Sequence, residues 1–216
     1  MSFGSMVGMT MLDAWLRSNL DATKRLVRKQ DWDYPIVISG PERSGKTALA
    51  TQMGLYYEGL ESDPMKILKH TVWGFEGIES SLPNLPRGSA IICHEPNLFG
   101  RRSNSNLNVR AMRVFTIIGA YNVLFILTLP SWHDLDRYFR NHRIRAHGRV
   151  HTNNGERGLV TWKVRPEGED IGEDIQFLEV NTHRFESIAG IYPDLWAEID
   201  RRDKAYKHAI LTMPIK

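Results

Sequence analysis

The feature that most constrains the fold is an eight-residue segment, Gly-Pro-Glu-Arg-Ser-Gly-Lys-Thr, at residues 40–47. An apolar run at 35–39 comes directly before it, and helix-forming residues at 48–53 come directly after it. Gly40 and Gly45 allow the backbone to curl so that successive N–H groups point inward, and the start of a helix adds its positive dipole end. The pattern predicts a phosphate-binding loop between a strand and a helix.

The polar residues of this loop suit the binding of a nucleoside triphosphate. The Lys46 ammonium would reach the β- and γ-phosphates, and the Thr47 hydroxyl would take one position on a Mg²⁺ ion. We therefore expect ATP and Mg²⁺ as cofactors. The alternative is a glycine turn that holds an ordinary lysine. The residues expected to contact the nucleotide are Gly40, Pro41, Glu42, Arg43, Ser44, Gly45, Lys46, Thr47 and Ala48.

The composition is that of one compact domain with a full core, because 42% of the 216 residues are hydrophobic and 25% are charged. No stretch approaches the roughly 20 apolar residues that span a membrane. Residues 1–11 lack the charged start and apolar segment of a secretory signal, so we expect a cytoplasmic protein. Cys93 is the only cysteine, which excludes an internal disulfide and a zinc site built from thiolates.

The net charge is +3, and basic residues are concentrated in one segment, 137–151. An acidic stretch follows at 167–174. A basic segment of this kind is either a solvated surface or a contact for nucleic acid or phosphate, and the sequence leaves both interpretations open.

Apolar patterns predict strands that alternate with helices through the first two thirds of the chain. This alternation indicates a mainly parallel sheet with right-handed crossovers, and so an α/β fold of three layers, the P-loop NTPase architecture. A hairpin around residues 153–155 should extend the sheet in antiparallel fashion. Strands are expected at 35–39, 70–73, 89–95, 123–129, 144–152 and 158–164, and helices at 11–29, 46–60, 77–82, 108–121, 134–141 and 193–209.

Three regions follow from this order of elements. Residues 1–32 form an N-terminal helical segment that we expect to pack on the core at the edge of the sheet. Residues 33–166 form the P-loop ATPase core, and residues 167–216 form a C-terminal loop and helix. Within that last region, residues 181–192 are predicted to be a loop.

Hydrolysis requires a group that orients and deprotonates the attacking water, and Glu95 is the predicted catalytic residue beside Lys46. It ends a near-continuous apolar run, which is typical of a strand buried in a parallel sheet. We expect that strand to lie next to the one before the P-loop, so that the carboxylate points toward the phosphates and contacts Mg²⁺ directly or through water. The alternative is that Glu95 only caps the following loop, with His94 bonded to a neighbouring carbonyl.

Two further groups of side chains could contact the γ-phosphate. The hydroxyls of Thr128 and Ser131, at the end of the strand over 123–129, are sensor candidates, although the β-propensity of Thr128 alone explains its place in a strand. An arginine, from this chain or a neighbouring subunit, could stabilise charge in the transition state. Arg43 could do so within the P-loop. The other candidates are Arg101, Arg102, Arg137, Arg140 and Arg143, with Arg110, Arg113 and Arg145 close to them in sequence, and an ordinary surface position is the alternative for each.

The order of these motifs resembles a known group of proteins. The segments GPERSGKT, SAIICHEP with NLFGRRSNSNLN, VLFILTLPSWHDLDRYFRNHRIRAHGRVHT and RGLVTWKV, within 33–164, are similar to small P-loop ATPases of viruses, prophages and mobile elements. Those proteins resemble the FtsK and HerA group of DNA-translocating motors and the ATP-binding domain of zonula occludens toxin. The resemblance implies an ATPase with a Mg²⁺-nucleotide cofactor, ring or chain oligomers, DNA as a partner, and a place in the host cytoplasm or with a virion.

Two positions depart from the pattern that the resemblance implies. In the family an apolar strand ends in Asp-Glu, whose aspartate holds Mg²⁺ through water, whereas this chain has His94 and Glu95. A neutral histidine adds no negative charge to the metal site. Many relatives also carry a polar amide where this chain has Leu129. Both departures affect hydrolysis more than nucleotide binding.

Three functions are compatible with the sequence. The first is an oligomeric ATPase that translocates or packages DNA. The second is a small-molecule or nucleotide kinase, which would need an arginine-rich lid and an acceptor pocket. The third is a nucleotide-gated assembly or loader protein with little turnover, which the neutral His94 favours.

Overall fold

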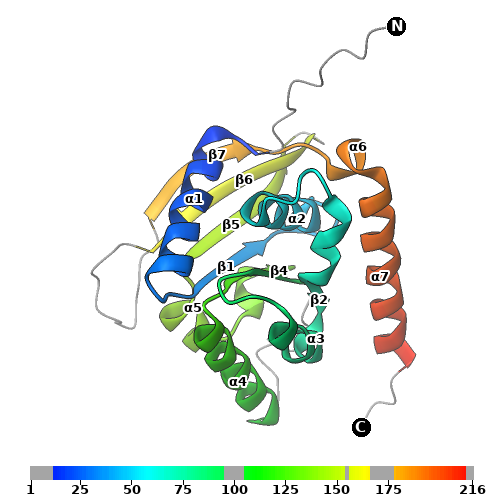
Figure 1. Cartoon of the computed structure of the whole chain (residues 1–216). Helices are drawn as coiled ribbons and strands as arrows, with labels where there is room; N and C mark the ends of the chain where they lie inside the picture. The colour runs from blue at the N-terminus through cyan, green and yellow to red at the C-terminus, as the bar shows by residue number, and fades with distance from the viewer. Residues whose placement is uncertain (1–11, 95–104, 154–155, 166–177, 213–216) are drawn as a thin grey trace, which may run out of the picture.

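The computed structural model describes residues 12–94, 105–153, 156–165 and 178–212. Within these residues the centre of the molecule is a seven-stranded sheet with the strand order β2-β3-β4-β1-β5-β6-β7 (Figure 1). The strands are β1 (Tyr34–Ser39), β2 (Thr71–Trp73), β3 (Ala90–His94), β4 (Leu124–Leu129), β5 (Ala146–Asn153), β6 (Glu156–Val164) and β7 (Leu178–Arg184). The first six confirm the strands predicted from apolar patterns.

The sheet is mainly parallel. The neighbouring strands β2, β3, β4, β1 and β5 run parallel to one another. In contrast, β6 pairs antiparallel with β5, and β7 pairs antiparallel with β6. This confirms the predicted α/β class with an antiparallel extension. The predicted order of two strands was wrong, because β4 lies between β1 and β3. The strand that ends at His94 is therefore not the neighbour of the P-loop strand. Strand order depends on how the crossovers pack, which local apolar patterns do not encode.

Helices cover both faces of the sheet, which gives the predicted three-layer α/β arrangement (Figure 1). One face carries α1 (Ala14–Lys29), α2 (Lys46–Glu58), α6 (Ile188–Ile191) and α7 (Pro193–Thr212). The other carries α3 (Gly74–Ser81), α4 (Ser105–Tyr121) and α5 (Arg137–His142). Short 3₁₀ turns are η1 (Pro64–Lys69), η2 (Leu82–Asn84) and η3 (Trp132–Asp134).

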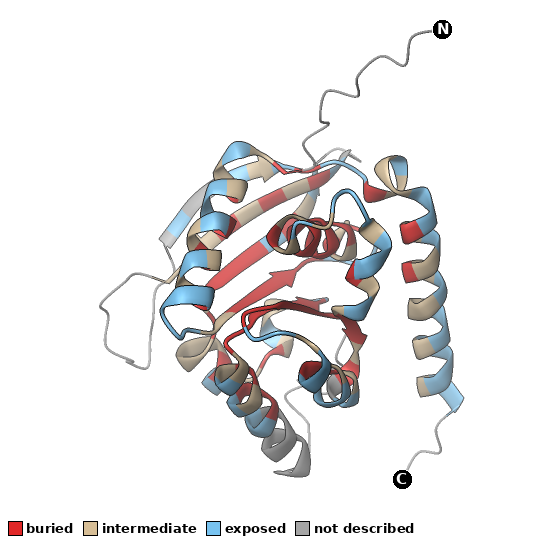
Figure 2. Cartoon of the chain, in the orientation of Figure 1, coloured by how far each residue is buried: buried red, intermediate tan, exposed pale blue. Residues whose placement is uncertain are grey.

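The central strands are buried on both faces, as Figure 2 shows. Along β1 the side chains alternate: Ile36 and Ile38 belong to the core under α1 and α2, and Val37 belongs to the core under α3, α4 and α5. This explains the near-continuous apolar runs, since a parallel strand between two helical layers has no solvated face.

The N-terminal helix α1 packs on a face of the sheet and not at its edge, so that detail of the prediction was wrong. Leu16 and Leu20 of α1 lie in the same core as Ile36 of β1 and Trp162 of β6. Burying this apolar stripe against a sheet face removes more surface from water than an edge contact could.

The segment predicted as a loop, 181–192, contains most of β7 and all of α6, so that prediction was wrong. β7 is rich in polar residues and lacks the apolar run of the other strands. The hydrogen-bonding edge of β6 supplies its pairing, with the Thr161 and Thr182 hydroxyls 2.9 Å apart across the two strands. α7 confirms the helix predicted at 193–209. In the described parts of the chain no helix is long and apolar enough to cross a membrane.

Candidate nucleotide-binding site

The P-loop joins the end of β1 to the start of α2, and its backbone contains three residues with positive φ. Gly40 has φ 155°, Arg43 has φ 58° and Gly45 has φ 106°. A Cβ atom at position 40 would lie 2.3 Å from the carbonyl oxygen of Val150 on β5, so only glycine fits there. Arg43 adopts a left-handed conformation without being glycine, and such strain is common in loops shaped around a ligand.

Lys46, the first residue of α2, lies against the loop. Its Nζ atom donates hydrogen bonds to the carbonyl oxygens of Gly40, at 2.9 Å, and Pro41, at 2.7 Å. Among the described residues no side chain caps α2, so the N–H groups of its first turn are available to a ligand. A lysine ammonium beside the uncapped end of a 13-residue helix is an arrangement that binds phosphate.

Two hydroxyls also belong to this loop. Ser44 is 1% exposed, yet its Oγ atom has no hydrogen-bond partner within the described structure. A buried hydroxyl without a partner indicates a position where a ligand or water bonds. The Thr47 residue lines the same cavity. The loop therefore fits a Mg²⁺-triphosphate, since Mg²⁺ usually takes one or two protein oxygens together with phosphate and water.

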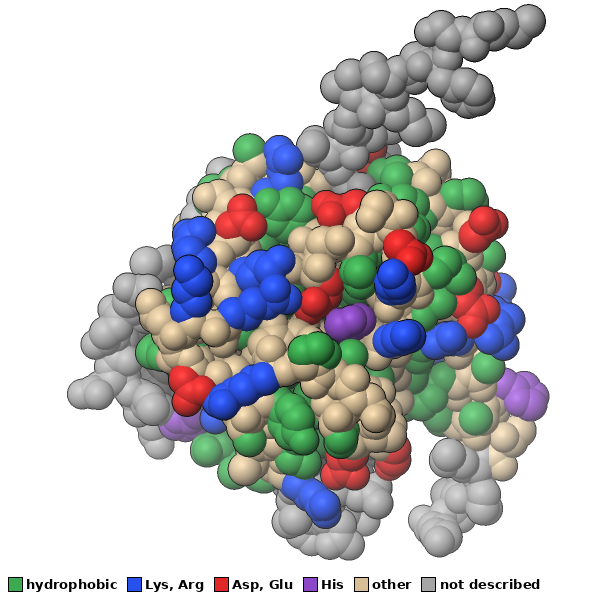
Figure 3. Space-filling model, viewed as in Figure 1, with side chains coloured by type: hydrophobic (Ala, Val, Ile, Leu, Met, Phe, Trp, Pro, Cys, Tyr) green, Lys and Arg blue, Asp and Glu red, His purple; other side chains and the backbone are tan. Residues whose placement is uncertain are grey.

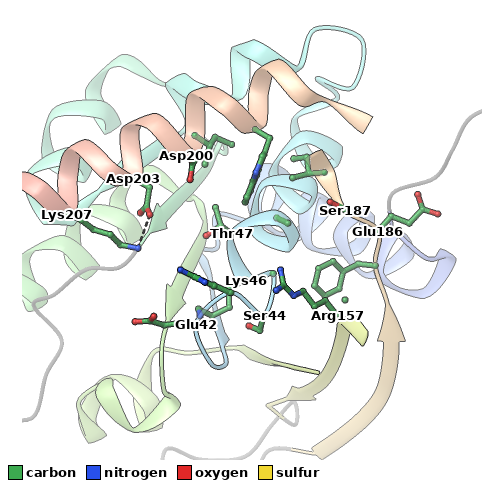
Figure 4. Close-up of a pocket in the computed structure, with 18 residues that line it drawn as sticks. Glu42, Ser44, Lys46, Thr47, Arg157, Glu186, Ser187, Asp200, Asp203 and Lys207 are labelled. Atoms are coloured by element: carbon green, nitrogen blue, oxygen red, sulfur yellow. Dashed lines mark ion pairs between the residues drawn. The ribbon is translucent and has the colours of Figure 1, made fainter. Parts of the chain in front are cut away.

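A cavity of about 480 Å³ opens beside the P-loop, within the size range of small-molecule sites (Figure 4). The P-loop residues from Glu42 to Ala48 form one wall. The start of β6, the connection from β7 to α6 and one face of α7 form the rest. Residues of these walls include Arg157, Phe185, Ile188, Trp196, Asp203 and Lys207.

The part of the wall that connects β7 to α6 is held in place by contacts to α2 and β6. The buried side chain of Gln52 on α2 donates from Nε2 to the carbonyl oxygen of Glu186, at 2.7 Å. The backbone N–H of Phe185 donates to the carbonyl oxygen of Gly158, at 2.8 Å. The Phe185 ring lies so close to the P-loop that a Cβ atom at Gly45 would be 3.1 Å away. The wall and the loop are therefore packed as one unit.

The wall formed by α7 was not foreseen from the sequence. Asp200, Asp203 and Lys207 point from α7 toward the side of the cavity that holds Lys46 and Thr47 (Figure 4). The only sequence signal was a regular spacing of charges along a helix, which is equally typical of a solvated surface. The predicted helix was correct, but its contact with a site about 150 residues earlier in the sequence is a tertiary feature.

His94, at the end of β3, is fully buried and neutral. Burial lowers its pKa to about 4, with a smaller raising effect from Asp203 and a lowering effect from Lys207. Its Nδ1 atom lies 3.2 Å from the Thr128 hydroxyl. This partner differs from the neighbouring carbonyl that was the alternative considered from the sequence. Its Nε2 atom has no hydrogen-bond partner among the described residues. No charge is available at this position near neutral pH.

The two sensor candidates are not among the residues that line the cavity. Thr128 is 1% exposed and bonds to His94. The Ser131 hydroxyl accepts the N–H of His133, at 3.2 Å, and the Ser131 N–H donates to Asp134, at 3.0 Å. Ser131 therefore forms a capping box that fixes the start of η3.

The arginine candidates are distributed over several places. Arg43 lines the cavity. Arg137 and Arg140 lie on α5 and Arg143 follows it, on the other face of the sheet. Arg143 donates to Asp33, at 2.7 Å, and to a carbonyl of α4, at 3.0 Å, so it joins α4 and α5 to the core. Three further predicted residues, Glu95, Arg101 and Arg102, lie outside the described residues.

A second buried histidine lies beneath the P-loop. The Nε2 atom of His147 on β5 is 2.7 Å from the hydroxyl of Ser39, the last residue before Gly40. The His147 ring stacks on Trp132, with ring centroids 4.2 Å apart. Burial lowers the pKa of His147 to about 4, assisted by nearby Lys163 and Arg149. This neutral pair fixes the strand that carries the P-loop against β5.

No protein-family model matches the sequence, and no curated protein matches it significantly. Among solved structures, the N-terminal domain of zonular occludens toxin from Neisseria meningitidis is similar over 75% of this chain and 98% of its own, with 13% identity and a TM-score of 0.43. The FIGL-1 AAA domain in complex with ADP is similar over 68% of this chain, with 13% identity and a TM-score of 0.43, and C. elegans PCH-2 over 67%, with 16% identity and a TM-score of 0.42. The matches span 56% and 45% of those two chains.

Proposed function

We propose that the chain binds ATP with Mg²⁺ in the cavity beside the P-loop and hydrolyses it. The observation that carries the proposal is Lys46, held by two loop carbonyls at the uncapped start of α2 and facing a cavity of about 480 Å³. A glycine turn with an ordinary lysine, the alternative, would require neither the buried unpartnered Ser44 hydroxyl nor the cavity.

The residues of the proposed site have separate roles in binding and hydrolysis. On ATP binding, Lys46 exchanges its bonds to the loop carbonyls for the β- and γ-phosphates, and the N–H groups at the start of α2 donate to the phosphates. The Thr47 hydroxyl and Glu95 would hold Mg²⁺, which, when bound, offsets the charge on the phosphate oxygens. Phe185 and the α7 wall enclose the cavity on one side. Glu95 is the proposed base for the attacking water.

The finer part of the proposal is that the enzyme is a subunit of an oligomeric DNA-translocating or DNA-packaging motor of a virus or mobile element, acting in the cytoplasm of a host. The sequence resemblance supports it, as do basic residues in and after α5 and along β5, such as Arg137 and Arg149, which are exposed. On the face that Figure 3 shows, basic side chains gather over α1 and alternate with acidic ones along α7. An arginine from a neighbouring subunit would complete the site.

One observation favours a second function, a nucleotide-gated assembly or loader protein with little turnover. His94 is neutral and bonded to Thr128, so it gives no charge to a metal ion. Binding through the P-loop does not need that charge, whereas a carboxylate that holds Mg²⁺ would assist hydrolysis. The kinase hypothesis has no comparable observation in its favour.

Phosphate release and ATP binding, measured separately, distinguish these functions. Wild-type protein should bind ATP in a Mg²⁺-dependent way, as measured by calorimetry. The Lys46→Ala substitution should reduce the affinity for ATP by at least about tenfold. DNA-stimulated phosphate release that disappears in Glu95→Gln supports the motor. Tight ATP binding without release supports the gated protein. Failure of wild-type protein to bind any nucleoside triphosphate would contradict both functions. DNA binding through the basic segment should also weaken steeply with salt.

A further inference from the structure

One face of α7 forms the wall of the cavity opposite the P-loop. The lining residues on this helix are Trp196, Ile199, Asp200, Asp203 and Lys207. Their spacing places them on one side of an α-helix. The same helix is anchored in the core through Leu195 and Ile199, both buried. The charged end of this face is therefore held at a defined place beside the cavity.

Asp203 and Lys207 form an ion pair at that end, with Nζ and Oδ2 2.8 Å apart (Figure 4). The indole N–H of Trp73, the last residue of β2, donates to the other carboxylate oxygen of Asp203, at 3.3 Å. Both charges act on the pKa of buried His94, the last residue of β3. The pair therefore lies near the carboxyl ends of β2 and β3, the edge of a parallel sheet at which ligands bind.

The same cavity contains a second mark of a ligand site. The Ser44 hydroxyl is buried, lines the cavity and lacks a hydrogen-bond partner among the described residues. Four basic and four acidic residues line the described walls. They are Arg43, Lys46, Arg157 and Lys207, and Glu42, Glu186, Asp200 and Asp203. An anion that binds Lys207 competes with Asp203 for its ammonium group.

We propose that Lys207 binds the γ-phosphate of the nucleotide and that Asp203 holds Lys207 in place until a γ-phosphate is present. The proposal rests on ATP binding as described above and adds a residue that distinguishes ATP from ADP within one chain. The side chains of Lys207 and Asp203 are 48% and 26% exposed, and an ion pair of this kind is weak. A terminal phosphate with about two charges competes for the ammonium effectively, whereas the β-phosphate of ADP is bound by the P-loop.

The test compares two nucleotides in calorimetry, ADP and the β,γ-imido analogue of ATP, each with and without Mg²⁺. Lys207→Met should weaken binding of the analogue by roughly tenfold and change ADP binding by less than about twofold. Asp203→Asn should tighten binding of the analogue several-fold under both conditions, because the competing carboxylate charge is removed. Thermal unfolding of each variant verifies that it folds.

Lys204→Met is the matched control. Lys204 pairs with Asp200 at 2.6 Å with the same spacing on the same helix, but it does not line the cavity. Its removal should leave both nucleotides bound as in the wild-type protein.

Trp73 gives a second measurement. Release of Asp203 from Lys207 changes the surroundings of the indole that is bonded to Asp203. Because Trp196 also lines the cavity, the diagnostic signal is the part of the fluorescence change that depends on Trp73, and the ATP analogue should produce this part whereas ADP should not. This part should be absent in Lys207→Met and in Trp73→Phe.

Two results would overturn the inference. One is an unchanged ratio of the two affinities in Lys207→Met, whether both affinities stay the same or both fall equally. The other is weaker analogue binding in Asp203→Asn that appears only with Mg²⁺. The last result would assign Asp203 to the metal ion. If wild-type protein binds both nucleotides and Lys207→Met retains their ratio, the inference fails and the proposed function stands. If wild-type protein binds neither, both fail.

Discussion

The Nδ1 atom of His94 and the Oγ1 atom of Thr128 lie 3.2 Å apart, in directly paired positions of β3 and β4. Both side chains are buried, so the bond is made away from water. Thr128→Val keeps the shape of the side chain but removes the hydroxyl, and it leaves both nitrogens of His94 without a hydrogen-bond partner among the residues that the structure describes. We expect a loss of about 1–3 kcal/mol in the free energy of unfolding, measured by urea denaturation. Thr116→Val, on an exposed part of α4, is the control and should change stability by less than about 0.5 kcal/mol.

His94→Asp tests whether a missing charge limits hydrolysis. An aspartate at the end of β3 would place a carboxylate beside Thr128 at the carboxyl edge of the sheet. If the proposed hydrolysis is limited by the missing charge, we expect Mg²⁺-dependent phosphate release to rise by about tenfold, or about 1.4 kcal/mol in activation free energy. His94→Asn has a similar size without the charge. Equal rates in the Asp and Asn variants would show that charge at this position does not limit turnover.

Stability should fall with acid between pH 6.5 and 4. Burial lowers the pKa of both His94 and His147 from 6.5 to about 4, so the unfolded chain binds protons in this range before the folded chain does. The stabilisation is therefore complete above pH 6.5 and is lost as the pH falls toward 4, at about 3 kcal/mol for each histidine. Urea denaturation at a series of pH values measures the slope. His147→Gln should make it shallower, and an unchanged slope would assign the acid effect to other groups.

Gly40→Ala should damage both folding and ligand binding. The added Cβ would lie 2.3 Å from the Val150 carbonyl oxygen, and φ at this position is 155°. We expect a loss of at least about 2 kcal/mol in stability together with a loss of ATP binding, measured by thermal denaturation and calorimetry. Gly190→Ala is the control, because a Cβ atom there meets nothing within 4 Å. Normal ATP binding by Gly40→Ala would contradict the requirement for glycine.

Local sequence patterns predicted the parts of the structure that are determined locally. The P-loop was predictable because Gly40, Gly45 and Lys46 each have a physical role within eight consecutive residues. The central strands were predictable because helical layers on both faces require uninterrupted apolar runs. In contrast, β7 pairs through its backbone with the edge of β6, and its polar side chains give no local signal.

The position of each residue relative to the cavity could not be derived in the same way. Placing β4 between β1 and β3 pairs Thr128 with His94, which no spacing in the sequence indicates. Arg143 was a candidate for the γ-phosphate because of its charge, yet in the structure it contacts Asp33 and the backbone of α4. The α7 wall arises from packing of Leu195 and Ile199 into the core, a contact between distant parts of the sequence.

The participation of α7 in the cavity has a consequence for protein synthesis. Lys46 and Thr47 are made early, whereas Asp203 and Lys207 are made later, after an interval on the order of 10 s of translation. A growing chain can form β1, the P-loop and α2 before the opposite wall of the cavity exists. If the protein binds ATP as proposed, ATP in the cell should therefore stabilise the completed fold but give little help to the nascent chain. A shortened chain that lacks α7 would likewise keep the P-loop but lose this wall of the cavity, and it should bind nucleotide weakly.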